Sequence, residues 1–291
     1  MHYTGTLYRN PYVPESPLLE VTQGCSHNRC RFCTMYRDVK FAPSPMEWVE
    51  ADLREIARQT PDADRLQLVG ADPFCLPAHR LREIAEKAHE HLPRLESICM
   101  AARVTNVMGK SQSDLDELRA LGIDELFIGT ESGDDWTLRR VEKGYAAADI
   151  IEQSAKLDGA GIRYWHTFLN GVAGAAHGAE HAENTARIFN ETHPVVVGTG
   201  ALVLFPGTPL AQEAACGSFD PQTEKGMLRE LCLFLENLEC DSMLITHHTH
   251  ALNLNGPFLA NKQESLRKLD YAIEAYDEEA MAHRRAMKVS L

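Results

Sequence analysis

The sequence predicts an α/β fold in which repeated strand and helix pairs build a parallel sheet. Six short, apolar, β-prone runs each precede a segment of helical periodicity, at intervals of about 30 to 40 residues. A chain of 291 residues, 44% of them hydrophobic, can bury a core, and no Pro-, Gly- or Ser-rich linker divides it. Such units join through right-handed crossovers, so an open doubly wound sheet is the simplest architecture.

The predicted strands lie between an extended lead-in and a C-terminal segment. They occupy residues 18–22, 65–70, 97–102, 125–129, 161–169 and 195–205. We expect residues 1–15 to form the lead-in, because Pro11 and Pro14 favour an extended backbone. The predicted division then gives a core domain over residues 16–245 and a C-terminal segment over residues 246–291.

Helices are predicted after the strands from apolar residues at helical spacing. Ser44, Pro45, Met46 and Glu47 have the pattern of a capping box with proline at the first helical position, and Pro77 opens the next helix. Further helices are expected over residues 115–121, 136–142, 147–157, 178–190, 228–238 and 266–276. The last of these is amphipathic and forms the predicted helical appendage. The charged stretch after it is predicted to be a solvated end.

Composition and charge narrow the function classes. The formal net charge of −13 argues against a general nucleic-acid-binding surface, which needs clustered Lys and Arg. No apolar run approaches the roughly 20 residues needed to cross a bilayer, and the first residues lack the apolar core of a signal peptide. We therefore expect a cytoplasmic protein that does not enter a membrane. Reduced cysteines fit that compartment.

Cys25, Cys30 and Cys33 follow the first predicted strand within nine residues. Thiolates this close repel one another and react readily, so a metal usually neutralises them. Disulfide bonds are a poor explanation for this group, because three cysteines cannot all be paired. With His27 as a fourth ligand they could form a zinc site, whereas three cysteines alone suit a cubane iron–sulfur cluster that leaves one iron open for a ligand. The remaining cysteines are spaced singly, and most of them are expected to be small buried core residues: Cys75, Cys99, Cys216, Cys232 and Cys240.

The stretch 18–36, LLEVTQGCSHNRCRFCTMY, resembles the cluster motif of the radical S-adenosylmethionine (SAM) enzymes. It is similar to the MiaB/NifB-type branch of that superfamily. The usual motif is Cys-x3-Cys-x2-Cys with an aromatic residue before the last cysteine, a place that Phe32 fills, and here the first gap holds four residues instead of three. The resemblance covers residues 16–245 and implies a partial (β/α)6 TIM-like barrel with its chemistry at the carboxyl ends of the strands.

The resemblance also implies which residues hold SAM at the ends of the second and fourth strands. Gly70, Ala71 and Asp72 occupy the place of a Gly-Gly-Glu-Pro-like motif that holds the amino group of the methionine part. Glu131 matches the glutamate of a Gly-x-Glu-Ser-Gly segment whose carboxylate reaches the ribose hydroxyls. Without the resemblance, the first group is an ordinary strand-to-helix turn and Glu131 is a helix cap.

Further along the chain, the resemblance implies a cation for the SAM carboxylate and a wall for the adenosine. Lys143 is the implied cation, with Arg139 and Arg140 as alternatives for the same role. Thr167 and residues 171–174 lie where relatives enclose the adenosine. Without the resemblance, Lys143 is a solvated lysine that stabilises a helix C-terminus.

The implied activity is radical chemistry on a small molecule that the sequence does not identify. A 4Fe-4S cluster would cleave SAM reductively to a 5′-deoxyadenosyl radical that abstracts hydrogen from the substrate, with a reductant such as flavodoxin or ferredoxin. We do not expect a cobalamin-dependent methyltransferase, because no cobalamin-binding domain stands ahead of the core. The alternative is a zinc- or iron–sulfur-stabilised barrel that binds or carries electrons without cleaving SAM.

One histidine-rich segment is not explained by the resemblance. If residues 246–250 form a strand, His248 and His250 share one face and, with His247 beside them, could bind a second metal or the substrate. The ordinary alternative is that these histidines only make hydrogen bonds at the surface or in the core.

Overall fold

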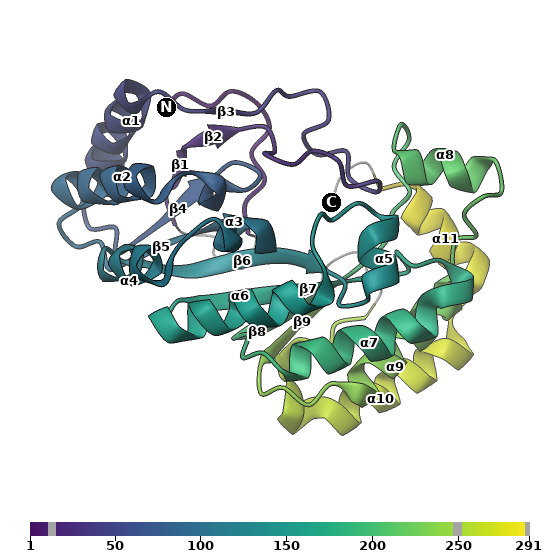
Figure 1. Cartoon of the computed structure of the whole chain (residues 1–291). Helices are drawn as coiled ribbons and strands as arrows, with labels where there is room; N and C mark the ends of the chain where they lie inside the picture. Colours follow the sequence, from purple (N-terminus) through teal and green to yellow (C-terminus); the bar gives the residue numbers. More distant parts are fainter. Residues whose placement is uncertain (11–15, 247–251, 289–291) are drawn as a thin grey trace. The chain divides into compact units, whose positions relative to one another are not determined.

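The computed structural model describes residues 1–10, 16–246 and 252–288. The chain folds into two compact units. The first unit contains Met1–Asn28, Tyr36–Gly129 and Gln153–Tyr164, and the second contains Arg29–Met35, Thr130–Glu152 and Trp165–Leu291. Figure 1 labels the helices and strands along the chain. His247, His248 and His250, with their proposed metal or substrate role, lie outside the described residues.

Four parallel strands and the helices between them form the first unit. In sheet order the strands are β1 (Leu18–Glu20), β4 (Arg65–Val69), β5 (Ser97–Ala102) and β6 (Ile123–Glu131), and a small antiparallel pair is made by β2 (Thr22–Gln23) and β3 (Ala42–Pro43). The helices are α1 (Met46–Gln59), η1 (Pro73–Cys75), α2 (Ala78–His91), α3 (Val104–Met108) and α4 (Gln112–Ala120). Leu66, Leu68 and Ile98 are almost fully buried, because both faces of a parallel sheet are covered.

The second unit continues the same pattern with β7 (Arg163–Asn170), β8 (Val196–Ala201) and β9 (Met243–Thr246), which are parallel, and the short antiparallel β10 (Gly256–Pro257). The last two residues of β6 belong to this unit and lie beside β7. Its helices are α5 (Asp135–Arg140), α6 (Ala147–Ala160), η2 (Ala175–His177), α7 (Gly178–Asn190), α8 (Pro209–Ala215), α9 (Glu224–Asn237), α10 (Phe258–Ala275) and α11 (Glu278–Ala286). The second half of α6 lies in the first unit.

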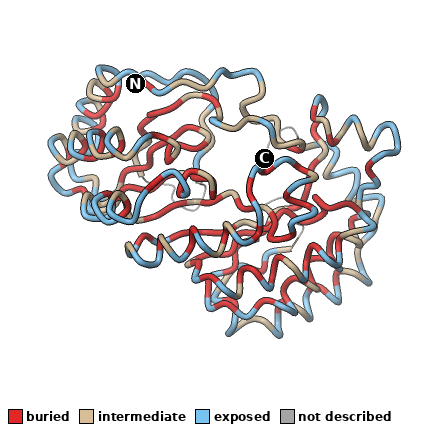
Figure 2. The backbone as a smooth tube through the Cα atoms, in the orientation of Figure 1, coloured by how far each residue is buried: buried red, intermediate tan, exposed pale blue. Residues whose placement is uncertain are grey.

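Helices α7, α9 and α10 pack side by side in the second unit (Figure 1). The apolar face of α9 explains this packing, because its leucines at helical spacing are buried. The ring of Phe234 on α9 stacks on Phe168 of β7 with centroids 4.1 Å apart, and Phe189 of α7 meets Phe234 edge-on. Aromatic contacts therefore join the helix layer to the strand. Figure 2 shows buried and exposed residues alternating along these helices.

The predicted α/β class with a parallel sheet is confirmed, and α7 has the predicted bounds. Three details were wrong. Pro45 is the N-cap of α1 and makes no side-chain cap, so the capping box is absent. Strand β9 was not predicted as a seventh parallel strand. The charged stretch after α10 forms a helix, α11.

No helix among the described residues is both long enough and apolar enough to span a bilayer. The division into a core over residues 16–245 and a C-terminal segment over residues 246–291 stays a prediction.

Candidate functional site

Cys30, Phe32 and Cys33 lie together on a tight turn of the second unit. The backbone N–H of Cys33 donates to the carbonyl of Cys30 at 3.2 Å, which closes the turn. Phe32 is only 8% exposed and sits in an apolar cluster with Val141, Leu169, Val172, Leu202, Leu210 and Phe219. Cys30 and Cys33 pack against that cluster and are half-buried. The aromatic residue between the two thiols therefore anchors the turn in the core.

Arg31 fixes the same turn from the opposite side. Its backbone N–H donates to Val141 at 3.1 Å, and its carbonyl accepts from Leu210 at 3.0 Å. Its guanidinium pairs with Glu142 at 2.9 Å and with Glu213, and Arg140 also pairs with Glu213. Two backbone bonds and two carboxylates thus hold the turn against the ends of α5 and α8, which gives the cysteines a defined position.

Lys143, the implied cation for the SAM carboxylate, lies beside Phe32. The side chain is only 3% exposed, and its Nζ is 5.9 Å from the ring centroids of both Phe32 and Tyr145. The two alternative cations have other surroundings: Arg139 is exposed, and Arg140 pairs with Glu213. Lys143 is therefore a buried residue next to the cysteine turn and not a solvated lysine at a helix end.

Glu131 and Thr167, both predicted site residues, are brought together at the carboxyl end of β6. The N–H of Glu131 donates to Thr167 Oγ1 at 3.2 Å. Glu131 has a φ of +68°, an uncommon conformation for a residue with a side chain. The preceding Thr130 bonds His166 Nδ1 at 2.8 Å and accepts from the Tyr145 hydroxyl at 2.7 Å. Burial lowers the pKa of His166 to about 3, so this histidine is neutral at physiological pH.

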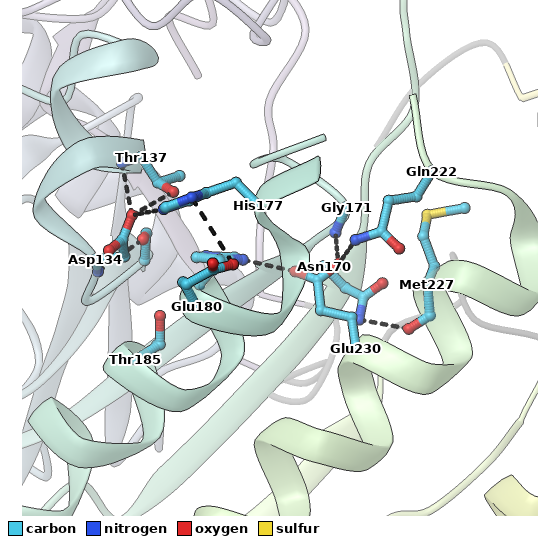
Figure 3. A network of polar contacts seen from close by, with 12 residues as sticks. Asp134, Thr137, Asn170, Gly171, His177, Glu180, Thr185, Gln222, Met227 and Glu230 are labelled. Carbon is cyan, nitrogen blue, oxygen red and sulfur yellow. Dashed lines mark hydrogen bonds and ion pairs between the residues drawn. The ribbon is translucent and has the colours of Figure 1, made fainter. Parts of the chain in front are cut away.

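Asp134 joins α5 to the segment that follows β7 (Figure 3). Its carboxylate caps α5 through the N–H of Thr137 at 2.8 Å. It also accepts from His177 Nε2 at 3.1 Å and from Asn184 at 2.8 Å. Burial acts to raise the pKa of Asp134, but these hydrogen bonds outweigh burial and hold that pKa below its ordinary value.

A second buried carboxylate, Glu230 on α9, holds the loop after β7 (Figure 3). It accepts from the N–H of Gly171 at 2.9 Å, from His181 Nδ1 at 2.6 Å and from the Gln222 amide. Asn170 donates to the Met227 carbonyl at 2.8 Å from the same strand end. Gly171 begins the predicted adenosine-enclosing segment 171–174, so that loop is fixed by α9. The sequence analysis missed Glu230, since a glutamate inside a helix gives no signal of burial.

In the first unit, Cys25 follows β2 and is half-buried. Its Sγ accepts from the backbone N–H of Asn28 at 3.4 Å. Burial and then the negative charge of Asp72 raise the pKa of the Cys25 thiol, while the positive charge of Arg103 opposes them. A thiol in this setting binds metal with release of a proton.

The segment Gly70, Ala71 and Asp72 directly follows β4. Its backbone at Gly70 lies very close to Thr22. Gly70 has a φ of +140°, and a Cβ there would collide with the hydroxyl of Thr22 and lie 2.5 Å from its carbonyl oxygen. Asp72 is 1% exposed and holds the N–H of Ser26 at 3.0 Å and also its hydroxyl. Within this unit, the predicted SAM residues therefore position the segment just after Cys25.

Arg103 and Asn106 are further candidates that the sequence analysis missed. Both are buried at the end of β5. Asn106 accepts from the N–H of Arg103 at 2.8 Å and donates to Asp72 at 3.4 Å. The signal that could have found them is an arginine at a strand end followed by a capping asparagine three residues later. The structure places polar residues at the ends of β2, β4 and β5 in this unit.

The three cysteines of the motif are divided between the two units, with Cys25 in the first and Cys30 and Cys33 in the second. In the described part of the chain no three His, Cys, Asp or Glu side chains are grouped as the ligands of one ion. In a cubane cluster each thiolate binds a different iron, so the sulfurs do not have to converge on one point. Of the other cysteines, Cys99, Cys232 and Cys240 are buried, which agrees with the prediction for most of them, while Cys75 is half-buried and Cys216 is exposed.

Comparisons with known proteins bear on the family and the fold of the chain. The profile of the Radical SAM superfamily matches residues 19–189, which is more than half of the chain. Nothing among the curated proteins matches.

Solved structures give the same fold. One is the radical S-adenosylmethionine methyltransferase TsrM of Kitasatospora setae with cobalamin and a [4Fe-4S] cluster (TM-score 0.53, 19% identity). The match covers 68% of this chain but only 40% of TsrM. Another is methylornithine synthase, PylB (TM-score 0.54, 16% identity, 93% of this chain and 85% of that one). A third is coproporphyrinogen III oxidase, HemN, of Escherichia coli (TM-score 0.54, 18% identity, 77% and 53%). These likenesses confirm the predicted fold class, the partial barrel of this type.

Proposed function

The chain belongs to the radical SAM superfamily, and on that premise we propose that Cys25, Cys30 and Cys33 hold a 4Fe-4S cluster with one open iron. The observation that carries the proposal is that the matched region contains all three cysteines, with Phe32 packed in the core between two of them. When bound, the cluster and SAM supply a one-electron reductive cleavage that starts radical chemistry on the substrate.

Residues of this chain bind and orient SAM. Lys143, buried beside Phe32, pairs with the carboxylate of the methionine part. Gly70 and Ala71 expose their backbone to its amino group, and Asp72 keeps the cysteine loop in place through Ser26. Glu131 binds the ribose hydroxyls, and its N–H bond to Thr167 holds it at the end of β6. These groups act by alignment, which is the protein's share of cofactor chemistry.

The implied partners are a small-molecule substrate and a one-electron reductant such as flavodoxin or ferredoxin. The net charge of −13 supports a substrate other than nucleic acid. The similarity of residues 18–36 to the MiaB/NifB-type branch supports placing the chain there. PylB, which the chain nearly covers, bears the name methylornithine synthase, and this supports a small-molecule substrate.

Reconstitution tests this function. The protein is loaded anaerobically with iron and sulfide, reduced with dithionite and given SAM, and 5′-deoxyadenosine is measured by liquid chromatography. We expect its release from wild type and from Cys216→Ser, whose exposed thiol lies outside the motif, but not from Cys30→Ser. Equal release from Cys30→Ser, or a colourless zinc-loaded wild type, contradicts the proposal.

A further inference from the structure

Tyr145 is a buried tyrosine in the connection between α5 and α6 of the second unit. Its side chain is only 8% exposed, and its hydroxyl donates to the carbonyl of Thr130 at 2.7 Å. A buried tyrosine hydroxyl usually finds a hydrogen-bond partner. This partner is the carbonyl of the residue directly before Glu131, so the contact reaches the backbone of a residue assigned to SAM.

The peptide group between Thr130 and Glu131 is held at both of its polar atoms by side chains. Tyr145 donates to its carbonyl oxygen, and its N–H donates to Thr167 Oγ1 at 3.2 Å. The two contacts come from different elements, because Thr167 lies on β7 whereas Tyr145 follows α5. A peptide group is planar, so contacts at both ends fix the orientation of its plane and with it the φ of Glu131.

The conformation of Glu131 at this peptide group is uncommon. Its φ of +68° lies in the left-handed region, which residues with a side chain adopt at a cost. Such a conformation persists where the surrounding contacts over-determine it. Thr130 and Ser132 are 0% exposed, whereas Glu131 between them is half-buried. The direction of the Glu131 carboxylate thus depends on the contacts that hold its backbone.

The ring of Tyr145 contacts a second residue assigned to SAM. The Nζ of Lys143 is 5.9 Å from the centroid of this ring, within the range of a cation–π contact. Gly144 between them has a φ of +83°, a conformation that favours glycine. The hydroxyl and the ring of Tyr145 therefore make separate contacts, and a phenylalanine would keep only the contact with Lys143.

We propose that Tyr145 is a positioning residue for Glu131: its hydroxyl fixes the peptide group before Glu131 and so directs the carboxylate to the ribose hydroxyls of SAM. This role rests on the proposed function, in which Glu131 binds the ribose. A residue that acts in this way changes the preference for a complete ribose. A residue that only stabilises the fold changes the affinity for every ligand alike.

Two ligands separate these roles. SAM and its 2′-deoxy analogue differ in one ribose hydroxyl, and calorimetric titration of the reconstituted, unreduced protein measures both affinities without cleavage. We expect wild type to bind SAM about tenfold more tightly than the analogue, because a hydrogen bond to a carboxylate is lost. Tyr145→Phe should lower this preference to about twofold or less, at unchanged iron content.

Tyr164→Phe is the matched control. Tyr164 is 1% exposed, and its hydroxyl donates to Asp158 at 3.4 Å, so this variant also loses the hydroxyl of a buried tyrosine. It should keep the wild-type preference. Glu131→Gln gives the preference that remains without the carboxylate. Thr167→Val removes the other side-chain contact of the same peptide group, and it repeats the test if Tyr145→Phe does not fold.

The proposal is overturned if folded Tyr145→Phe keeps the wild-type preference, including a loss of affinity by the same factor for both ligands. Failure of this role and failure of the proposed function are distinguishable. If Tyr145→Phe keeps a preference that Glu131→Gln loses, Glu131 still binds the ribose and only the role of Tyr145 fails. If wild type has no preference, or neither binds SAM nor releases 5′-deoxyadenosine on reduction, the proposed function of Glu131 fails and the role of Tyr145 fails with it.

Discussion

Gly70 has a backbone conformation that residues with a side chain rarely adopt. Its φ is +140°, and a Cβ would collide with Thr22. We expect Gly70→Ala to lower the free energy of unfolding by about 2 kcal/mol or more, through strain and displacement of Thr22. Gly109→Ala is the matched control. Gly109 has a φ of −74°, and a Cβ added there would come no closer than 3.8 Å to another residue. Urea unfolding compares them, and equal midpoints for the two variants contradict the expected strain.

In the proposed function, Lys143 orients SAM by pairing with its carboxylate. We expect Lys143→Met to weaken SAM binding at least about tenfold, since a charge-assisted hydrogen bond contributes about 1.5 to 3 kcal/mol. Methionine keeps the packing against Phe32, so the iron content should not change. Calorimetric titration of the reconstituted protein measures the affinity. Arg139→Met, at an exposed position on α5, is the control, and unchanged affinity in Lys143→Met rules out the assigned role.

The structure brings together some of the residues that the resemblance assigned to SAM, although their contacts with one another were not predicted. Lys143 lies beside Phe32, and Glu131 bonds Thr167. The contacts of Asp72 with Ser26 and of Glu230 with Gly171 could not be predicted, because they join residues 46 and 59 positions apart. A buried carboxylate has no sequence pattern of its own, and only the tertiary structure supplies its donors.

Helix α11 has no buried residue and is held by polar contacts. Arg285→Lys keeps the charge but loses the double hydrogen bond to Glu224, because an ammonium group cannot reproduce the planar guanidinium. We expect amides of α11 to exchange about tenfold faster, which corresponds to about 1.4 kcal/mol of local stability. Hydrogen exchange followed by mass spectrometry measures it. Arg284→Lys, exposed on the same helix, should exchange as wild type does, and equal rates in both variants speak against this attachment.

Asp134 joins α5 to η2 and α7 through a carboxylate whose pKa is held below its ordinary value of 3.8. We expect Asp134→Asn to reduce the free energy of unfolding at pH 7 by about 1 to 3 kcal/mol, because the amide places a donor opposite other donors. A lowered folded-state pKa stabilises the protein above the unfolded-state pKa, and this contribution disappears as the pH falls through the folded-state pKa.

The difference between wild type and Asp134→Asn should therefore be full at pH 7 and shrink below about pH 4. Urea midpoints at a series of pH values measure it. Asp62→Asn, at an exposed position, should unfold at the wild-type midpoint at every pH. If the stability difference between wild type and Asp134→Asn grew as the pH fell, a lowered folded-state pKa of Asp134 could not explain it.

The elements that the sequence predicted least well were those whose structure depends on distant partners. Strand β9 is short, and its strand partners are the distant β8 and the short β10. Helix α11 has no buried residue, so it lacks the apolar periodicity that marks a helix in a sequence. The start of α1 was misassigned by one residue because Pro45 satisfies both the N-cap and the first helical position in sequence patterns.

For the whole molecule, alternation of strands and helices was enough to predict a parallel α/β fold. Periodicity did not choose between an open sheet and a barrel, because both bury the strands on two faces. That choice came from the cysteine motif and from the superfamily it resembles, and the solved relatives confirm it. Net charge, which acts over the whole molecule, informs the choice of partner and not the fold.

The central claim is that three thiolates leave one iron of a cluster open for SAM. Electron paramagnetic resonance of the dithionite-reduced, reconstituted protein tests it directly, with Cys216→Ser as a control that keeps the motif. We predict a reduced 4Fe-4S signal whose g-values shift when SAM is added, in wild type and in the control. A signal that SAM leaves unchanged, or stoichiometric zinc in place of the cluster, would contradict it.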